Sequence, residues 1–489
     1  MPIKNSRIHG LGSASFLIIF SLASLVNALN NGLARTPPMG WSSWNAFHNN
    51  IEAALITQTA DKLVSTGLAA AGYKYLNIDD GWYNSPNASQ FNSTKFPNGI
   101  KPVVDHAHGL GLKVGIYTKW DSRNNETRDA NAWASWGIDY VKYDSWQQFS
   151  TDTAIWTTMR DAIKATGRPM VYSVHFQDRA KVIGNPTHMN MWRFTNDMIP
   201  YYNPETRPKG MEWGMTTLDV IAGMERVANI TGPGYWADAD MLMVEIGKQT
   251  MDEWKTQFAM WCLLPAPLLM ASDIRTSPKS ILDIYLNKDL IAVNQDTLGS
   301  KAWKVRGAGN QQVWARRLAD SSVAAVLINS GATDTQLTVS WTELKVQSGK
   351  ALVRDLWRNQ DIGLNTGSYS VVVPTHGTAM IKVTPERLIS VGSRRTVVKT
   401  EFNAQLINGI LECTLPLSVT APILANINVY EASGREIGSV KRRLEPRIKN
   451  SVALNSLVRK PGAYLLSIQT DQADLNFIKK MRYNISQAK

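Results

Sequence analysis

Two short segments of the chain each place a basic and an acidic side chain on the same face of a predicted β-strand. In DYVKYDSW (139–146), Lys142 and Asp144 share a face because side chains along a strand alternate with a period of two. In WRFTND, Arg193 and Asp197 share a face for the same reason. Buried ion pairs contribute little net stability once desolvation is counted, so we expect both pairs to have a chemical role.

Two carboxyl groups beside cations suit glycoside hydrolysis, in which one attacks the sugar or activates water and the other protonates the leaving oxygen. Lys142 would favour the ionised form of Asp144, as a nucleophile needs. A second carboxyl group in drier surroundings would keep its proton at neutral pH. The 17 Trp and 15 Tyr residues could line a sugar site with their flat faces, although their number alone is better explained by hydrophobic cores.

Carboxylates or other polar groups end four of the predicted strands. In a (β/α)8 barrel the C-terminal ends of the strands converge on one mouth, so these groups would meet in one pocket. A single terminal Asp is often only the N-cap of the next helix. Four such ends, with Lys142 and Arg193 beside them, favour an active site. The four segments are NIDDGW (77–82), KYDSW (142–146), WRFTND (192–197) and ADADM (237–241).

From residue 36 to residue 297 the pattern alternates between short strand-like runs and helix-like stretches such as 53–72 and 217–230. Eight strands with helices between them over about 260 residues predict an α/β fold of the (β/α)8 TIM-barrel type. A doubly wound open sheet is the alternative, but no GxGxxG follows the first strand. The eight strand segments are PMGWSSWN, YKYLNID, LKVGIYT, DYVKYD, MVYSV, MWRFTND, GYWADADML and PLLMAS.

The pattern divides the chain into four parts. Residues 1–28 are predicted to be a secretory signal peptide, because a basic start precedes the apolar run FLIIFSLASLV and the motif VNA, ending at Ala28, fits a cleavage site. This predicts a secreted or cell-surface protein, with an uncleaved anchor as the alternative. Residues 29–297 form the predicted barrel, 298–386 an antiparallel β-sandwich and 391–489 a small β-rich domain.

The Cys, His and charged residues argue against a disulfide-stabilised fold, a metal site and a nucleic-acid partner. Cys262 and Cys413 fall in different predicted domains, so no disulfide framework is expected. The seven His residues make no metal-ligand spacing with them, so we expect neither a metal nor another cofactor. Of the net charge of +12, residues 391–489 contribute +8, from 15 Lys and Arg against 7 Asp and Glu. No nucleic-acid module accompanies this charge, so acidic cell-surface material, and not nucleic acid, is the expected partner of the basic domain.

Seven motifs occur in order along the chain: TPPMGWSSWNAF, GYKYLNIDDGW, GLKVGIY, WASWGIDYVKYD, MWRFTND, GPGYWADADML and APLLMASDIR. Together they resemble the α-galactosidase (melibiase) family of retaining glycosidases, glycoside hydrolase family 27, in its bacterial form. The resemblance runs from Thr36 to VRDLWRNQDIG (353–363) and implies a (β/α)8 barrel followed by an antiparallel β-sandwich. It also implies double displacement, with Asp144 as the nucleophile and Asp197 as the acid/base. Retention requires these two carboxyl groups to lie about 5–5.5 Å apart.

The same resemblance implies substrate-binding roles for seven further residues. Most of these are polar groups that would bind the hydroxyls of one galactose ring. They are Trp41 as an apolar wall, Asp79 and Asp80 for the 4- and 6-hydroxyls, Lys142 for the 3- or 4-hydroxyl, Arg193 for the 2-hydroxyl, and Tyr117 and Asp240 as pocket members with less defined roles.

The chain departs from the family pattern at three places. Gly81 and Trp146 stand where the family commonly has disulfide-forming Cys. Lys119 replaces an acidic residue after GIY, in a shorter loop. His175, in VYSVHFQD, occupies a segment that often carries a Glu or a small residue facing the 2-hydroxyl. We therefore assign His175 to the substrate site, with a purely structural role as the alternative. The last two changes leave the exact glycone open.

The resemblance, together with the predicted signal peptide, implies a secreted retaining exo-glycosidase that removes terminal α-D-galactosyl residues from oligosaccharides or galactomannan. Within this class β-L-arabinopyranosidase is the nearest rival, because its sugar is galactose without the C6 hydroxymethyl group. α-N-Acetylgalactosaminidase and isomalto-dextranase follow. A non-catalytic carbohydrate-binding protein belongs to a different class, but it would need neither Asp144 nor Asp197. A metal-dependent barrel hydrolase would need His ligands that the sequence lacks.

The segment beyond residue 391 lies outside this resemblance. Its motifs INVYEASGREIGS and KPGAYLLSIQT resemble C-terminal sorting domains of surface-secreted bacterial enzymes. An auxiliary β-sandwich that binds carbohydrate is the alternative. The sorting interpretation predicts attachment to the cell surface through this basic domain.

Overall fold

The chain divides into two compact units, Met1–Leu388 and Ile389–Lys489. The predicted signal peptide (1–28) and Trp146 lie outside the described residues. In this computed structural model the described residues are 29, 31–119, 122–144, 153–175 and 188–386 in the first unit, and 403–407, 410–414, 422–431, 436–446, 448–454, 456–457, 462–470 and 477–483 in the second.

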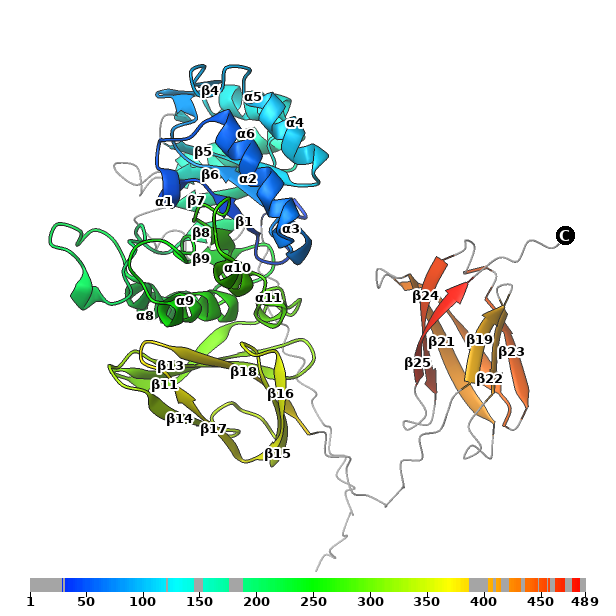
Figure 1. The fold of residues 1–489 in the computed structure, drawn as a ribbon. Coiled ribbons are helices and arrows are strands. Elements are labelled where there is room, and N and C mark those ends of the chain that lie inside the picture. Colours follow the sequence, from blue (N-terminus) through cyan, green and yellow to red (C-terminus); the bar gives the residue numbers. More distant parts are fainter. Residues whose placement is uncertain are drawn as a thin grey trace, which may run out of the picture. The chain divides into compact units, whose positions relative to one another are not determined.

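Eight short parallel strands form one curled sheet in the first unit (Figure 1), in the order β10-β1-β2-β5-β6-β7-β8-β9. Backbone pairing of Leu242, which follows β9, with Met270 of β10 joins the two ends of the sheet. The predicted (β/α)8 barrel is therefore confirmed, and the alternative of an open doubly wound sheet is wrong. The strands are β1 (Met39–Ser42), β2 (Tyr75–Ile78), β5 (Lys113–Lys119), β6 (Tyr140–Asp144), β7 (Val171–His175), β8 (Met191–Arg193), β9 (Trp236–Asp238) and β10 (Leu268–Met270).

Amphipathic helices alternate with these strands. In α2, residues spaced three or four apart, such as Ile56, Ala60 and Leu63, are buried against the barrel core. The single helix predicted over 53–72 is divided into α2 and α3, because Gly67 adopts a left-handed φ of 85° between them. The helices are α1 (Trp44–Phe47), α2 (Ala53–Ser65), α3 (Leu68–Ala71), α4 (Lys101–Gly109), α5 (Glu126–Trp136), α6 (Thr153–Ala165), η2 (Pro204–Thr206), α8 (Thr217–Val227), α9 (Met251–Leu263), α10 (Lys279–Tyr285) and α11 (Lys288–Asn294), and a small hairpin, β3 (Tyr83–Asn84) and β4 (Asn87–Phe91), follows β2.

Two of the long helices begin at capping boxes that are visible in the sequence. The Thr216 side chain accepts a hydrogen bond from the backbone N–H of Asp219, whose carboxylate accepts one in return, at the start of α8. Thr250 and Glu253 do the same at the start of α9. Local contacts therefore set the ends of the loops that follow β8 and β9, where several predicted site residues lie.

The interior of the barrel depends on one small residue in β5. A Cβ atom on Gly115 would lie 2.1 Å from the side-chain oxygen of Asn77 and 2.8 Å from the ring of Tyr140. These two side chains thus occupy the space that any larger residue would need. They form part of the floor beneath the strand ends that carry the predicted site.

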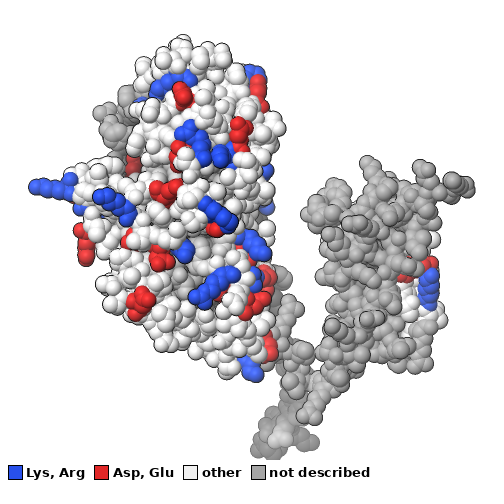
Figure 2. Space-filling view, viewed as in Figure 1, with Lys and Arg blue, Asp and Glu red and all other residues white. Residues whose placement is uncertain are grey.

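An antiparallel β-sandwich follows the barrel in the same unit. The buried core of the barrel continues into it through Trp314 and Met380, and Arg316 donates from Nη1 to the backbone oxygen of Val293 at 2.8 Å. Lys and Arg are interspersed with Asp and Glu over the visible face of this unit (Figure 2). The six-stranded sheet has the order β11-β12-β13-β18-β15-β16 and contains β11 (Ala302–Ala308), β12 (Gln311–Arg317), β13 (Val323–Asn329), β15 (Lys350–Asp355), β16 (Gln360–Thr366) and β18 (Thr378–Pro385), and β14 (Thr335–Ser340) pairs with β17 (Ser368–Val373).

The described residues of the second unit form antiparallel strands. Its sheets have the orders β19-β20-β23 and β22-β21-β24-β25. Both Cys residues are free thiols, Cys262 in α9 and Cys413 in β20. Among the described residues, no helix has the length and apolar character needed to cross a membrane. The strands are β19 (Asn403–Ile407), β20 (Ile410–Thr414), β21 (Ile423–Glu431), β22 (Glu436–Leu444), β23 (Lys449–Ala453), β24 (Gly462–Thr470) and β25 (Phe477–Tyr483).

Candidate active site

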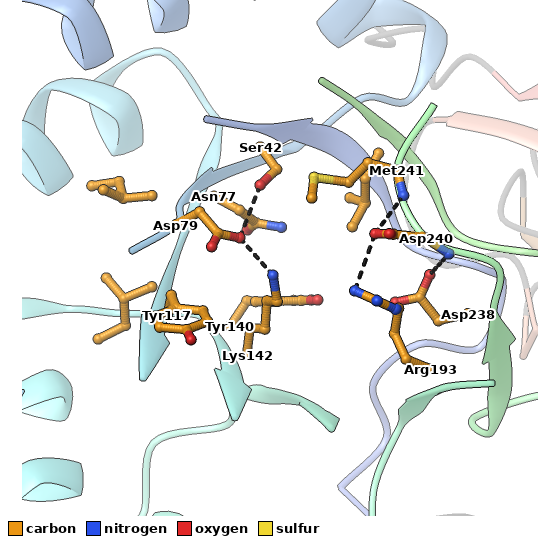
Figure 3. A pocket seen from close by; sticks show the side chains of 13 residues that line it. Ser42, Asn77, Asp79, Tyr117, Tyr140, Lys142, Arg193, Asp238, Asp240 and Met241 are labelled. Atoms are coloured by element: carbon orange, nitrogen blue, oxygen red, sulfur yellow. Dashed lines mark hydrogen bonds and ion pairs between the residues drawn. The ribbon is translucent and has the colours of Figure 1, made fainter. Parts of the chain in front are cut away.

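Polar side chains converge in a pocket at the C-terminal ends of the barrel strands (Figure 3). The pocket is lined by residues of β2, β5 and β6 and of the segments around β8 and β9. This is expected of a barrel, in which the C-terminal ends of parallel strands meet at one mouth. Five residues predicted from the sequence line the pocket: Asp79, Tyr117, Lys142, Arg193 and Asp240. Residues that we did not assign to the site also line it, among them Ser42, Asn77, Tyr140, Asp238 and Met241.

Lys142 forms its ion pair with Asp79. Its Nζ lies 2.8 Å from Asp79 Oδ2, which also accepts a hydrogen bond from Ser42 Oγ at 3.3 Å. Burial acts to lower the pKa of Lys142, but the carboxylates of Asp79 and then Asp144 outweigh it and raise that pKa. Lys142 and Asp144 face the same side of β6, as predicted, yet the cation contacts the acid at the end of β2. The alternation of side chains along β6 gives only the side of the strand to which Lys142 points, so it could not identify Asp79 as its partner.

Asp144, at the end of β6, contacts the neighbouring strand β7. The sheet register places it beside His175, whose Nδ1 lies 3.1 Å from Asp144 Oδ1. The hydroxyl of Tyr117 donates to the other oxygen, Oδ2, at 3.4 Å. Burial acts to raise the pKa of Asp144, but the charges of His175 and then Lys142 outweigh it and lower that pKa. An ionised carboxylate is therefore favoured, as expected for a nucleophile.

Arg193 lies between two carboxylates. Its Nη2 is 2.6 Å from Asp197 Oδ1, and its Nη1 is 3.2 Å from Asp240 Oδ1. The Arg193 side chain is 4% exposed, whereas that of Asp197 is 50% exposed. Burial acts to raise the pKa of Asp197, but Arg193 and then His175 outweigh it and lower that pKa. The expectation that the second carboxyl group keeps its proton in drier surroundings is wrong for the free protein, because Asp197 is half exposed and ion-paired.

Asp240 is held in an unusual backbone conformation. Its φ of 71° lies in the left-handed region, which non-glycine residues rarely adopt. Several contacts hold it there: its carboxylate accepts from the backbone N–H of Met198 at 2.8 Å, and its backbone oxygen accepts from Trp261 Nε1 at 2.8 Å. Strain that is over-determined in this way is typical of functional sites.

Asp238 is the most informative residue that our interpretation of the sequence missed. It is buried at the end of β9, and its Oδ1 accepts from the backbone N–H of Asp240 at 2.9 Å. Burial raises the pKa of Asp238 to about 6 against the opposing effect of Arg193, and the charge of Asp240 adds to the rise. The two-residue spacing in ADADM was the available signal, since it placed Asp238 on the same face as Asp240.

Five predicted residues are not among those that line this pocket: Trp41, Asp80, Asp144, His175 and Asp197. Asp80 forms an ion pair with Lys119, whose Nζ lies 3.3 Å from Asp80 Oδ2. Trp41 is completely buried and donates from Nε1 to the backbone oxygen of Ser272 at 2.8 Å. The roles of Asp80 in hydroxyl binding and of Trp41 as a sugar wall stay predictions. Within the described part of the chain, no group of three or more His, Cys, Asp or Glu side chains could hold a metal ion.

Comparisons with known proteins agree with this architecture. Residues 36–296 match the family described as alpha galactosidase A, and residues 308–383 match the alpha galactosidase C-terminal beta sandwich domain. An α-galactosidase of Cyamopsis tetragonoloba is 36% identical over 73% of this chain and 88% of its own length. The structure of α-galactosidase I from Mortierella vinacea is similar, with a TM-score of 0.67 and 32% identity over 73% of this chain and 100% of that one. A β-L-arabinopyranosidase from Geobacillus stearothermophilus shares the fold, with a TM-score of 0.64, but only 22% identity over 75% of this chain and 99% of that one.

Proposed function

Because this chain belongs to the α-galactosidase family of glycoside hydrolases, we propose that it removes terminal α-D-galactosyl residues from oligosaccharides or galactomannan by double displacement. The observation that carries the proposal is the convergence of Asp144 and Asp197 on one cation-lined barrel mouth. Relatives named α-galactosidase support the choice of sugar. A carbohydrate-binding protein without catalysis is disfavoured because it would need neither carboxyl group.

The first step forms a glycosyl-enzyme. An oxygen of ionised Asp144 bonds to the anomeric carbon while the glycosidic bond breaks, and the leaving oxygen takes a proton from Asp197. Asp197 must gain this proton after substrate enters, because Arg193 favours its ionised form in the free protein. A sugar that covers the half-exposed carboxyl group and draws Arg193 to its 2-hydroxyl would raise the pKa of Asp197.

The second step releases the sugar. A water molecule gives a proton to Asp197, and the oxygen of that water bonds to the anomeric carbon. The ester bond to Asp144 breaks at the same time, which frees the Asp144 carboxylate. Asp144 carries no charge while it is esterified, so its repulsion of an ionised Asp197 disappears. That change favours the base form of Asp197 in this step. The Asp79–Lys142 pair and Arg193 would meanwhile hold the hydroxyls of the ring.

One observation favours β-L-arabinopyranosidase as the second candidate. Lys119 engages Asp80, the carboxylate expected to bind the 6-hydroxyl, and an arabinopyranoside has no 6-hydroxyl. The test is to compare kcat/KM of the purified protein on an aryl α-D-galactoside and an aryl β-L-arabinopyranoside. We expect the galactoside to be preferred. The opposite preference would select the second candidate, and no turnover of either would refute the glycosidase function.

We further propose that the protein is exported by cleavage of its N-terminal segment near Ala28 and held at the cell surface by its basic C-terminal domain. The sequence patterns support both points. N-terminal sequencing of the exported protein should start near Leu29. If the C-terminal domain instead binds carbohydrate, the isolated full chain should bind an insoluble polysaccharide in the presence of galactose, which would occupy only the barrel.

A further inference from the structure

His175 has hydrogen-bond acceptors on both sides of its ring. Its Nε2 lies 3.1 Å from the backbone oxygen of Thr195, and its Nδ1 lies 3.1 Å from Asp144 Oδ1. A carbonyl oxygen only accepts, so Nε2 must carry a hydrogen. In a neutral ring Nδ1 would then present a lone pair to the carboxylate, which is repulsive. The contacts are consistent when the ring carries a hydrogen on both nitrogens while Asp144 is ionised.

The surroundings of this contact strengthen the interaction. His175 and Asp144 are 5% and 8% exposed, so water screens their charges poorly. The carboxylates of Asp144 and Asp197 both interact with the charge of the ring, and the strand register places Arg193 of β8 beside His175. The ring forms an ion pair with Asp144 when both are charged.

Each oxygen of Asp144 therefore contacts a side chain from a different neighbouring strand. His175 on β7 contacts Oδ1, and Tyr117 on β5 donates to Oδ2. Two such contacts restrict rotation of the carboxyl group about its Cβ–Cγ bond. Both ring nitrogens of His175 are already next to oxygen atoms, which argues against our initial assignment of this residue to the 2-hydroxyl of the sugar.

We infer that His175 is a positively charged positioning residue, which keeps Asp144 ionised and oriented for attack. This inference rests on the proposed function, in which Asp144 is the nucleophile. It has one consequence for the pH dependence of kcat/KM, which reports on groups of the free enzyme. Removal of the cation should raise the pKa of Asp144, and so move the acid limb to higher pH.

The test compares the wild-type protein with two variants. His175→Asn keeps an amide donor near the position of Nδ1 without charge, and His175→Phe keeps the size of the ring without nitrogen. On an aryl α-D-galactoside we expect His175→Phe to lose about 100-fold in kcat/KM, the scale for a lost preorganised donor. His175→Asn should recover part of that loss, with its acid limb shifted to higher pH. An unshifted acid limb in both variants, or a change confined to KM, would overturn the inference.

A second measurement separates this inference from the proposed function. The full-length protein, with ¹⁵N-labelled imidazole rings, contains seven His residues, and His175→Asn identifies the His175 signals by their loss. At neutral pH we expect both ring nitrogens of His175 to be protonated, and Asp144→Asn to return the ring to the neutral state. A neutral ring in the wild-type protein would refute the inference even if the enzyme is active. A positive ring in a protein that cleaves neither glycoside would refute only the proposed function.

Discussion

Arg193 and Asp197 form an ion pair, with Nη2 2.6 Å from Oδ1, that joins a buried guanidinium to a half-exposed carboxylate. The proposed proton donor therefore rests in its ionised form, with its pKa lowered by Arg193 and His175 against the effect of burial. A general acid needs the opposite state at the moment of bond cleavage. The pair thus links proton uptake to the arrival of the sugar.

Binding of galactose at neutral pH should take up a proton. Covering Asp197 with the sugar removes water from its carboxyl group and competes for Arg193, and both changes raise its pKa. Titration calorimetry in buffers of different ionisation enthalpy should show uptake of up to about one proton per sugar bound. Asp197→Asn is the control and should show little uptake. Equal values for both proteins would mean that the proton arises elsewhere.

Asp144→Ala should lose roughly 10⁴-fold or more in turnover, as removal of a catalytic nucleophile does. Added azide should restore turnover of an aryl α-D-galactoside and yield a glycosyl azide of inverted configuration, because azide attacks the sugar directly. In Asp197→Ala, azide should instead attack the glycosyl-enzyme and yield the retained configuration. Product analysis by NMR distinguishes the two. Substantial activity of Asp144→Ala without azide would show that another group is the nucleophile.

Lys119→Ala should increase the preference for galactoside over arabinopyranoside. The change removes the ammonium group 3.3 Å from Asp80 Oδ2 and leaves that carboxylate available to the 6-hydroxyl. We expect a rise of about tenfold or more in the ratio of the two kcat/KM values, since one hydrogen bond to a charged group contributes about 1.5–3 kcal/mol net of competition with water, and about 1.4 kcal/mol is a factor of ten. Lys101→Ala, which removes an exposed ion pair with Asp105, is the control and should leave the ratio unchanged. A lower ratio in Lys119→Ala would mean that Lys119 itself favours galactoside.

Asp238→Asn should flatten the loss of stability between pH 4 and pH 7. The native pKa of Asp238 is about 6, above that of an unfolded Asp at about 4, so the native state binds more protons in this window. Wild-type stability from this group is therefore present at pH 4 and is lost as pH rises through 6. Relative to wild type, the free energy of unfolding of Asp238→Asn should rise by about 2–3 kcal/mol over that range.

Urea unfolding at both pH values measures this difference. Asp320→Asn is a matched control on the sandwich, because the native pKa of Asp320 is about 2 and lies below the window. Its difference from wild type should therefore stay nearly constant between pH 4 and pH 7. A constant difference for Asp238→Asn as well would show that Asp238 does not retain its proton in the native state.

A chain that ends at Glu386 should keep wild-type kcat/KM on aryl glycosides. The residues that line the pocket and the two matched family regions all lie within the first unit. The shortened chain should lose only the cell-surface retention proposed for the basic domain, measured by fractionation of the producing cells. Retention equal to that of the full chain would place the attachment signal elsewhere.

Much of this site follows from local sequence. Alternation along β6 is a property of the extended backbone, so it placed Lys142 with Asp144 on one face. The same argument is wrong for Arg193 and Asp197, because β8 ends at Arg193 and Asp197 lies beyond the strand. The eight strands were identified because their apolar and β-branched residues recur between helix-like stretches. The motif resemblance then predicted the roles of Asp144 and Asp197.

The partners of these side chains were decided only by the tertiary structure. Lys142 contacts Asp79 because β2 and β6 flank β5, and His175 contacts Asp144 because β7 pairs with β6 in that register. The pKa of Asp197 is lowered in the free protein because Arg193, which forms an ion pair with it, and then His175 outweigh the effect of burial. Distances between strands far apart in the chain depend on the pairing register and on closure of the barrel. The alternation of side chains within one strand gives no information about either.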